Sequence, residues 1–488
     1  MSCIEGVYVV SFTNEHRKRL EIMEKADVLI LKNICDPDLF PVIKKRKTDK
    51  KLTVYEIADD LTAIPEWNPV YFFYKNPENQ ALFQRLAHLC DIVQVTCEEL
   101  KRIYSHLNDS IYVLPNQISI IPPIKEKKYD GEVIIGWGGS HGHLEDIKII
   151  SDSLIDFITS RQNIKLHLMC SEPIWHLFSR LPEEKKRYFK TGSIDEYYRF
   201  LSGLHIGLAP LSDSAFNRSR SDVKFLEYAV SGAVPVVSNM EPYKENVIHG
   251  DTGFLFNNEV ELVKCLETII NEPDLLSETG LKSREYVLKN RLEKEHSKER
   301  LSIYKNRFES LNGRDNSDDE ALELFTSFSK LDGAVRHNRH IKLEPCRFEI
   351  MIQKGLTTMQ IDKNRDEALK HFNEASLLEP FNYLPFMFGS TLLSDPVNVL
   401  IKAIEYQPDS IKSWLMLGDC FARQRKVKEA IQSFENASKI HPEYELPYIK
   451  AGNLLKQLGD EKQSEMMMGK ASTLQKKILA NNNIAAIN

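Results

Sequence analysis

The residues best placed for chemistry lie where a predicted strand gives way to a helix. The strand is predicted over 206–211, a polar loop follows, and the helix is predicted to begin near Asp222 with Ser221 as its N-cap. Apolar residues recur on one side of this helix, and Gly232 ends it before the next strand. A helix that begins at the carboxyl end of a strand binds anions, because its free N–H groups and its dipole point at the ligand.

Charged side chains around this helix start suit a phosphorylated ligand. Arg220 and Lys224 add positive charge beside the predicted anion site. Glu227 lies one turn further into the helix, where its carboxylate can accept hydrogen bonds from two hydroxyl groups. A diphosphate followed by a ribose fits this order. On these residues alone, Lys224 and Glu227 also fit an ordinary i,i+3 surface ion pair.

Two other groups of side chains could suggest a metal site. Asp36 and Asp38 form an Asp-x-Asp pattern, which metal-dependent enzymes of another fold use to hold a cation on a diphosphate; here we interpret it as a turn. The second group follows a glycine loop and consists of His141, His143, Glu145 and Asp146. Ligands this close together on a loop-to-helix turn rarely converge on one ion, so we predict no metal.

A scaffold of alternating strands and helices must position these residues. In residues 1–310 apolar runs alternate with amphipathic stretches, which predicts an α/β fold with parallel sheets. The first set of predicted strands covers 7–12, 27–32, 52–57, 91–96 and 111–116. The second set covers 132–138, 164–170, 206–211 and 234–238. A Pro-rich, charged hinge separates the sets, so we expect two doubly wound Rossmann-like domains, over 1–125 and 126–310, with a cleft between them.

Several segments, in the same order, resemble the family 4 glycosyltransferases, which have the GT-B fold of two facing Rossmann-like domains. The family's donor-site segment is similar to KFLEYAVSGAVPVVSN (224–239) and DTGFLF (251–256). Its C-terminal domain opens with a strand and glycine loop similar to VIIGWGGSHGHLEDI (133–147). Part of its N-terminal domain resembles VYEIADDLTAIP (54–65). The resemblance covers about residues 25–310.

The resemblance implies a hexosyltransferase that uses a nucleotide-diphosphate sugar as donor, retains the anomeric configuration, and needs no metal or other cofactor. It implies that Glu227 binds the ribose of the donor. The residues that it places near the diphosphate are Arg220, Ser221 and Lys224, with Gly138, Gly139 and Ser140 as a loop of close approach. A glycan, a lipid-linked molecule or a protein would be the acceptor.

The sequence departs from the family's pattern at three points. Ser219 stands where the family often has a second Glu, eight residues before Glu227. The usual Arg and Lys after the glycine loop are missing. No Gly-rich first loop is recognisable in the N-terminal domain, which is short. One alternative is therefore a non-catalytic interaction protein with a decayed transferase domain, and another is a nucleotide-sugar epimerase, which shares the fold.

Asp59 and Asp60 end a predicted strand on the side where the cleft is expected. They could contact hydroxyl groups of the acceptor, or they could cap the turn that follows. Both alternatives are open, and Asp60 is the candidate catalytic residue.

A period of 34 residues marks the last part of the chain. Trp414 and Tyr448 are 34 residues apart, and so are several small residues. This spacing predicts pairs of antiparallel helices, with Gly418 where two helices cross closely. The pattern resembles tetratricopeptide repeats, with three good copies and a shortened one over 383–410. The array (346–480) is expected to dock a protein or peptide, or else to serve as a spacer.

The stretch between these regions, 311–345, is polar and changes from acidic to basic, which predicts a linker with one short helix near 319–331. Because it has few large apolar residues, we expect the α/β domains and the array to share little buried core and to fold separately. The helical stretch over 281–309 is long enough to pack back across the α/β domains.

Composition narrows the class of protein. The net charge of −6 argues against binding nucleic acid through bulk electrostatics. The eight cysteines are scattered without a C-x-x-C pair, which suits a reducing compartment. No apolar run approaches the roughly 18 residues of a membrane span, and the N-terminus lacks the features of a signal peptide. We expect a cytoplasmic protein, in solution or peripheral at the inner face of the membrane.

Overall fold

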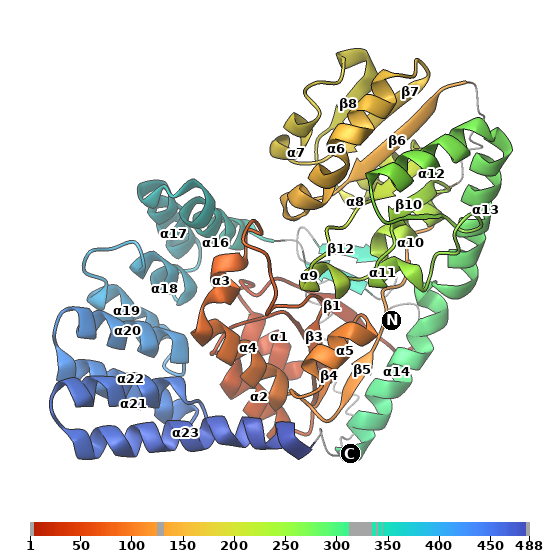
Figure 1. The fold of residues 1–488 in the computed structure, drawn as a ribbon. Coiled ribbons are helices and arrows are strands. Elements are labelled where there is room, and N and C mark those ends of the chain that lie inside the picture. The colour runs from red at the N-terminus through yellow and green to blue at the C-terminus, as the bar shows by residue number, and fades with distance from the viewer. Residues whose placement is uncertain (1–3, 124–130, 312–333, 338–339, 344, 485–488) are drawn as a thin grey trace.

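The computed structural model describes residues 4–123, 131–311, 334–337, 340–343 and 345–484. It contains two Rossmann-like α/β domains and a helical array that lies along one flank of the first domain (Figure 1). Within the described residues, no helix is both long and apolar enough to cross a membrane.

The first domain is built on a four-stranded parallel sheet in the order β2-β3-β4-β5. Its strands are β2 (Val28–Lys32), β3 (Leu52–Ile57), β4 (Ile92–Val95) and β5 (Ile111–Val113). Its helices are α1 (Arg19–Lys25), α2 (Leu39–Thr48), α3 (Tyr71–Lys75), α4 (Pro77–Leu89) and α5 (Glu98–Tyr104). Every residue of β4 is buried, as expected of a parallel strand that is covered on both faces.

The second domain has a six-stranded parallel sheet in the order β11-β10-β9-β6-β7-β8. The four strands predicted there are β6 (Val133–Gly138), β7 (Ile164–Met169), β9 (Ile206–Ala209) and β10 (Val234–Ser238). Two strands at the edges of the sheet were not predicted, β8 (Lys186–Phe189) and β11 (Phe254–Phe256).

Helices cover this second sheet and lead back to the first domain. The first group is the 3-10 helix η1 (His141–His143), α6 (Leu144–Thr159), α7 (Glu172–Leu177), the 3-10 helix η2 (Glu183–Lys185) and α8 (Ile194–Ser202). The second group is α9 (Ala215–Arg218), α10 (Val223–Val230), α11 (Glu241–Lys244), α12 (Glu259–Asn271), α13 (Pro273–Asn290) and α14 (Glu293–Ser310).

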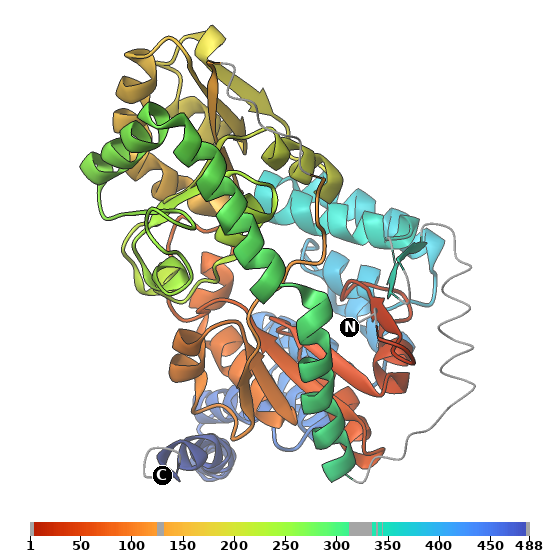
Figure 2. The same ribbon diagram turned by 90° about the vertical axis from the view of Figure 1, so that its right-hand side faces the viewer.

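The last of these helices confirms that the stretch over 281–309 packs back across the α/β domains. Figure 2 shows α14 leaving the second domain and running along the first. Tyr304 on α14 is 1% exposed and packs in one cluster with Leu52, Val54 and Ile92 from the sheet of the first domain. α14 therefore serves as a covering helix of the first sheet, although it follows the second domain in sequence.

A small separate sheet corrects two expectations. β1 (Val9–Ser11), predicted as the first strand of the N-terminal domain, pairs instead with β13 (His340–Leu343). β13 also pairs with β12 (Ala334–His337), so these strands form a three-stranded sheet, β1-β13-β12. Residues 334–343 were expected within a linker, which is therefore wrong for these strands. The short helix expected near 319–331 lies outside the described residues.

The array consists of four helix pairs. They are α16 (Arg347–Thr357) with the π-helix η3 (Thr358–Asp362) and α17 (Arg365–Leu378), α18 (Leu384–Ser390) with α19 (Val397–Tyr406), α20 (Ile411–Arg423) with α21 (Val427–Ile440), and α22 (Leu446–Gln457) with α23 (Glu461–Ile484). The shortened copy corresponds to α18 and α19. A Cβ at Gly418 would lie 2.4 Å from the ring of Phe434, which confirms the close helix crossing predicted there.

A continuous apolar core joins the array to the first domain, so the expectation of little shared core is wrong. One cluster of buried side chains contains Phe40 of the first domain together with Ile411 and Phe434 of the array. The ring of Phe40 stacks on that of His441 with centroids 4.4 Å apart, and it also contacts the ring of Tyr444. The repeat pattern predicted that the array docks a partner. The first domain itself covers one face of the array.

Buried polar groups cross the same interface. Asp38, expected in a turn, directly precedes α2, and its carboxylate accepts hydrogen bonds from the backbone N–H of Lys412 (2.9 Å) and the hydroxyl of Ser410 (3.0 Å). Asp36 pairs with the buried Arg19, with Nη1 and Oδ2 2.8 Å apart. The Asp-x-Asp pattern therefore helps to hold the first domain against the array.

Candidate functional site

The strand order of the second domain marks where a ligand would bind. From β6, the chain extends the sheet through β7 and β8 on one side, then through β9, β10 and β11 on the other. In doubly wound sheets, ligands bind at the carboxyl ends of the strands beside such a switch point. β6 ends at Gly138, and α10 begins in the segment that follows β9. The predicted glycine loop and the predicted helix start therefore lie at this edge of the sheet.

Lys224, Glu227 and Tyr197 form one hydrogen-bonded group here. The hydroxyl of Tyr197, on α8, donates to Oε2 of Glu227 (2.7 Å) and accepts from Nζ of Lys224 (2.6 Å). Nζ of Lys224 also lies 3.2 Å from the same carboxylate oxygen. The side chains of Lys224 and Glu227 are only 18% and 15% exposed, so the pair is more enclosed than an ordinary surface ion pair. Tyr197 was not among the predicted site residues.

The amino end of α10 differs by one residue from the prediction. Its N-cap is Asp222 rather than Ser221, and the helix begins at Val223 without a side-chain cap. Asp222 is paired with Arg291 in the interior (Nη2 to Oδ1, 2.9 Å), while Ser221 accepts a hydrogen bond from the side-chain amide of Asn116, which follows β5 (2.8 Å). Because no side chain caps the first turn of α10, its backbone N–H groups can serve a ligand.

Arg220 adds positive charge to the same edge. Its guanidinium lies over the ring of Phe216, 5.3 Å from the centroid. Burial lowers the pKa of His143, and the charges of Arg220 and Lys224 lower it further against the opposing effect of Asp146. These effects place both predicted cations near the helix that follows β6.

Packing explains the glycines at the end of β6. A Cβ at Gly138 would lie 2.9 Å from the ring of Tyr197, and a Cβ at Gly139 would lie 2.5 Å from the ring of Trp137. A larger residue at Gly138 would therefore displace the ring whose hydroxyl binds Glu227, and a larger residue at Gly139 would displace the ring of Trp137. Ser140 follows and precedes the short helix η1. An additional role of this loop in approaching phosphates stays a prediction.

The histidine and acidic group after the glycine loop positions the loop that follows β9. Nδ1 of His143 lies 2.9 Å from Oδ2 of Asp146. Oδ1 of Asp146 accepts hydrogen bonds from the backbone N–H and hydroxyl of Ser212 and from the side-chain amide of Asn217. Within the described residues, no group of three or more His, Cys, Asp or Glu side chains is arranged to hold a metal ion.

Asp60 caps the turn after β3. Its side chain is buried, and Oδ1 accepts hydrogen bonds from the backbone N–H of Thr62 (3.0 Å), the hydroxyl of Thr62 (2.6 Å) and the hydroxyl of Tyr104 (3.2 Å). Of the two alternatives for this residue, the turn cap is present in the structure. A catalytic role for Asp60 stays a prediction.

Ser219, at the position of the family's second Glu, lies inside the contact between the two domains. It is fully buried, and its hydroxyl donates to the carbonyl oxygen of Phe216 (2.8 Å). The thiol of Cys97 in the first domain donates to the carbonyl oxygen of Ser219 (3.2 Å). Phe216 itself packs in the core cluster of the first domain. This segment therefore ties the second domain to the first.

The first domain also approaches η1, the short helix after the glycine loop, with an aromatic segment. A Cβ at Gly142 would lie 3.4 Å from the side-chain amide nitrogen of Asn68. Phe72 and Phe73, which follow Asn68 on α3, are 81% and 44% exposed. Its sequence pattern does not distinguish this segment, because its rings resemble those of a core helix.

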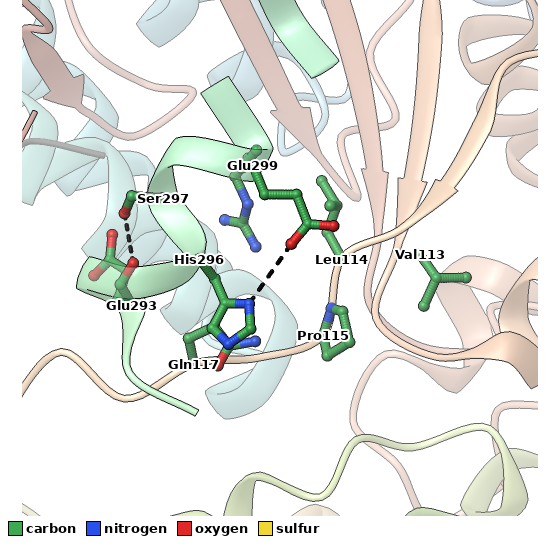
Figure 3. A pocket seen from close by; sticks show the side chains of 9 residues that line it. Val113, Leu114, Pro115, Gln117, Glu293, His296, Ser297 and Glu299 are labelled. Atoms are coloured by element: carbon green, nitrogen blue, oxygen red, sulfur yellow. Dashed lines mark hydrogen bonds and ion pairs between the residues drawn. The ribbon is translucent and has the colours of Figure 1, made fainter. Parts of the chain in front are cut away.

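A separate pocket lies where α14 passes the end of β5 (Figure 3). It is lined by Val113, Leu114, Pro115 and Gln117 and by five side chains of α14. Among these, Nδ1 of His296 and Oε2 of Glu299 are 3.7 Å apart. None of the predicted site residues lines this pocket, so it is distinct from the edge that carries Lys224 and Glu227.

One part of the array matches a known family model. The family model described as "Tetratricopeptide repeat" matches residues 411–444. Residues 411–444 are a tetratricopeptide repeat. They form α20 and α21, whose neighbouring helix pairs continue the tetratricopeptide array on both sides. No curated protein matches the sequence.

The chain is also similar to several solved structures at low identity. A TarM variant of S. aureus in complex with Fondaparinux, alpha-GlcNAc-glycerol and UDP is 14% identical, with 58% of this chain and 57% of that chain covered and a TM-score of 0.46. HepE of Anabaena in complex with UDP-glucose is 12% identical, with 61% and 81% covered and a TM-score of 0.45. MamA is 17% identical over 33% of this chain and 89% of that one, with a TM-score of 0.25. This chain spans little more than half the length of the TarM structures.

Proposed function

We propose that this protein is a glycosyltransferase that transfers a hexosyl group from a nucleotide-diphosphate sugar to a glycan, a lipid-linked molecule or a protein. The observation that carries the proposal is the group formed by Tyr197, Lys224 and Glu227 beside the uncapped start of α10. It lies at the switch point of a doubly wound sheet, where phosphorylated ligands bind. The segments that resemble the family 4 glycosyltransferases support the same function.

The proposed chemistry assigns each group one task. The first turn of α10, with Arg220 and Lys224, stabilises the negative charge that develops on the leaving diphosphate. Glu227 binds the ribose hydroxyls and so fixes the nucleotide along the helix. The aromatic segment around Asn68 lies beside Gly142 of η1 and is proposed as part of the acceptor side. The transfer is proposed to retain the anomeric configuration and to need no metal.

Replacing Glu227 with Ala is expected to weaken nucleotide binding by about 2–3 kcal/mol, the scale for losing hydrogen bonds to a charged group. Isothermal titration calorimetry with UDP, GDP and ADP measures the change for whichever of them the protein binds. Glu245→Ala, which removes an exposed carboxylate beyond α11, is the matched control. Equal affinity of the Glu227 variant and the parent chain would refute the ribose assignment.

Chelation of divalent cations is expected to leave turnover unchanged, because protein cations and the helix start are proposed to stabilise the diphosphate. Initial rates of sugar transfer or donor hydrolysis are compared in EDTA and in added Mg²⁺ or Mn²⁺. A strict requirement for a divalent cation would contradict the proposed mechanism. In that case His141 and His143, which follow the glycine loop, would be the candidate metal ligands.

A second candidate function is a non-catalytic interaction protein that has kept the nucleotide site. The burial of Ser219 favours it, because this position offers no carboxylate to a donor hexose. Nucleotide binding without any sugar transfer to glycan, lipid-linked or protein acceptors would support this candidate. No feature of the site favours an epimerase.

For the array, we propose docking of a protein or peptide on the faces that the first domain leaves open. Leu377 and Phe381, both 80% exposed, lie on one such face. The location proposed is the cytoplasm or the inner face of the membrane. The free cysteines among the described residues are in keeping with a reducing compartment.

A further inference from the structure

Tyr197 occupies an unusual position in the donor site, because its single hydroxyl joins both charged residues of α10. It donates to Oε2 of Glu227 and accepts from Nζ of Lys224. Nζ of Lys224 also lies 4.9 Å from the centroid of the Tyr197 ring. The ring itself packs against Gly138, where a Cβ would come within 2.9 Å. Tyr197 thus connects the end of β6 to the face of α10 that holds the predicted ligand groups.

We propose that Tyr197 is a positioning residue that orients Glu227 toward the two hydroxyls of a ribose, so that the site selects ribonucleotides over dideoxyribonucleotides. The inference rests on the proposed function, since it assigns the nucleotide to this edge of the sheet. It adds a residue that neither the helix motif nor the family resemblance pointed to.

The hydrogen bonds explain how one hydroxyl orients the carboxylate. Without Tyr197, Lys224 would be the only described partner of Glu227, and an i,i+3 ion pair leaves the carboxylate free to rotate. With Tyr197 present, Oε2 receives two donors from different helices, α8 and α10. Within the described structure, Oε1 has no protein donor and is the oxygen that a ribose diol would meet.

Tyr197 keeps this role across the pH range of an assay. Burial raises its pKa well above the ordinary value, and the neighbouring charge of Glu227 raises it further. The phenol therefore stays protonated and remains a donor to the carboxylate. Lys224 is held by the same phenol oxygen, so loss of the hydroxyl removes a hydrogen bond from both charged groups at once and leaves only their mutual ion pair.

The test compares ribose and dideoxyribose forms of the same nucleotide in the full-length protein. Affinities of UDP, GDP and ADP and of their 2′,3′-dideoxy analogues are measured by calorimetry for the parent chain and for Tyr197→Phe. The phenylalanine keeps the ring against Gly138, so the fold is retained, and thermal unfolding checks this. Tyr198→Phe, on the same helix, is the matched control, because no hydrogen bond joins the Tyr198 hydroxyl to Lys224 or Glu227 in the described structure.

The parent chain is expected to prefer the ribose form at least tenfold, and Tyr197→Phe to reduce that preference to about threefold or less by weakening the ribose form alone. Tyr198→Phe is expected to keep the preference. An equal loss for both forms would show that Tyr197 only packs the site, and an increased affinity would show that it obstructs the site. Either result overturns the inference while leaving the proposed function intact. If the parent chain binds none of the six nucleotides, the proposed function itself is wrong.

Discussion

A chain that ends at residue 312 is expected to aggregate or to unfold at a much lower temperature than the full-length protein. Removing the array would uncover Phe40, which is fully buried against His441 and Tyr444. Uncovering a large apolar side chain costs about 1.5–3 kcal/mol, which is a sizeable part of the whole stability of a domain, about 5–15 kcal/mol. The uncovered apolar patch would also favour aggregation.

Solubility, size-exclusion elution and thermal unfolding of residues 1–312 measure this effect. The control supplies residues 346–488 as a separate chain, which is expected to restore solubility if the two parts form one core. A fragment of 1–312 that is monomeric, unfolds cooperatively and binds nucleotide would show that the array is an accessory. That outcome was the expectation from the sequence, and the shared core now contradicts it.

The main elements of the fold were predictable because local patterns determine them. Short apolar runs such as VPVVS become buried parallel strands, and a 34-residue period with small residues at the crossings becomes paired helices. Strands β8 and β11 were not predicted, each for a different reason. KRYF carries two charges and lies at the edge of the sheet, whereas FLF has only three residues. Neither segment shows enough alternation or length to be distinguished from a loop.

The interface between the first domain and the array was not predictable from local pattern. Arg85 and Glu445 are separated by 360 residues, and each looks like an ordinary exposed residue of a helix. Asp38 likewise resembles a turn residue, and only the folded chain brings Lys412 and Ser410 to its carboxylate. The polarity of the linker therefore gave no information about whether the first domain and the array contact each other.

The sequence predicted the site residues that share one segment and missed the one that lies on another helix. Arg220, Lys224 and Glu227 belong to one segment, so their spacing alone places them near the start of one helix. Tyr197 lies on a different helix and reads as an aromatic residue of an amphipathic surface, because its hydroxyl has no partner within its own segment. The N-cap was predicted one residue too early, since Ser and Asp are equally good caps. In the structure the side chain of Asp222 pairs with Arg291 and does not cap the helix.

Replacing Glu445 with Ala is expected to destabilise the protein by about 3–5 kcal/mol, because it leaves the Arg85 guanidinium buried without a counter-charge. Arg85 and Glu445 are 4% and 3% exposed, and both Nε and Nη2 of Arg85 donate to Oε2 of Glu445. Glu443→Ala, which removes an exposed carboxylate two residues away, is the control and is expected to have little effect.

Urea unfolding followed by circular dichroism and by tryptophan fluorescence measures the change, since the four tryptophans lie in the first domain (Trp67), the second domain (Trp137 and Trp175) and the array (Trp414). The double variant Arg85→Met with Glu445→Leu is expected to recover most of the loss, because removing both charges leaves no uncompensated group in the interface. If Glu445→Ala proved no more harmful than Glu443→Ala, the buried pair would not hold the array to the first domain. If it shifted the unfolding of the array alone, the two parts would not unfold as one cooperative unit. A single transition that moves in both probes is the result that one shared core requires.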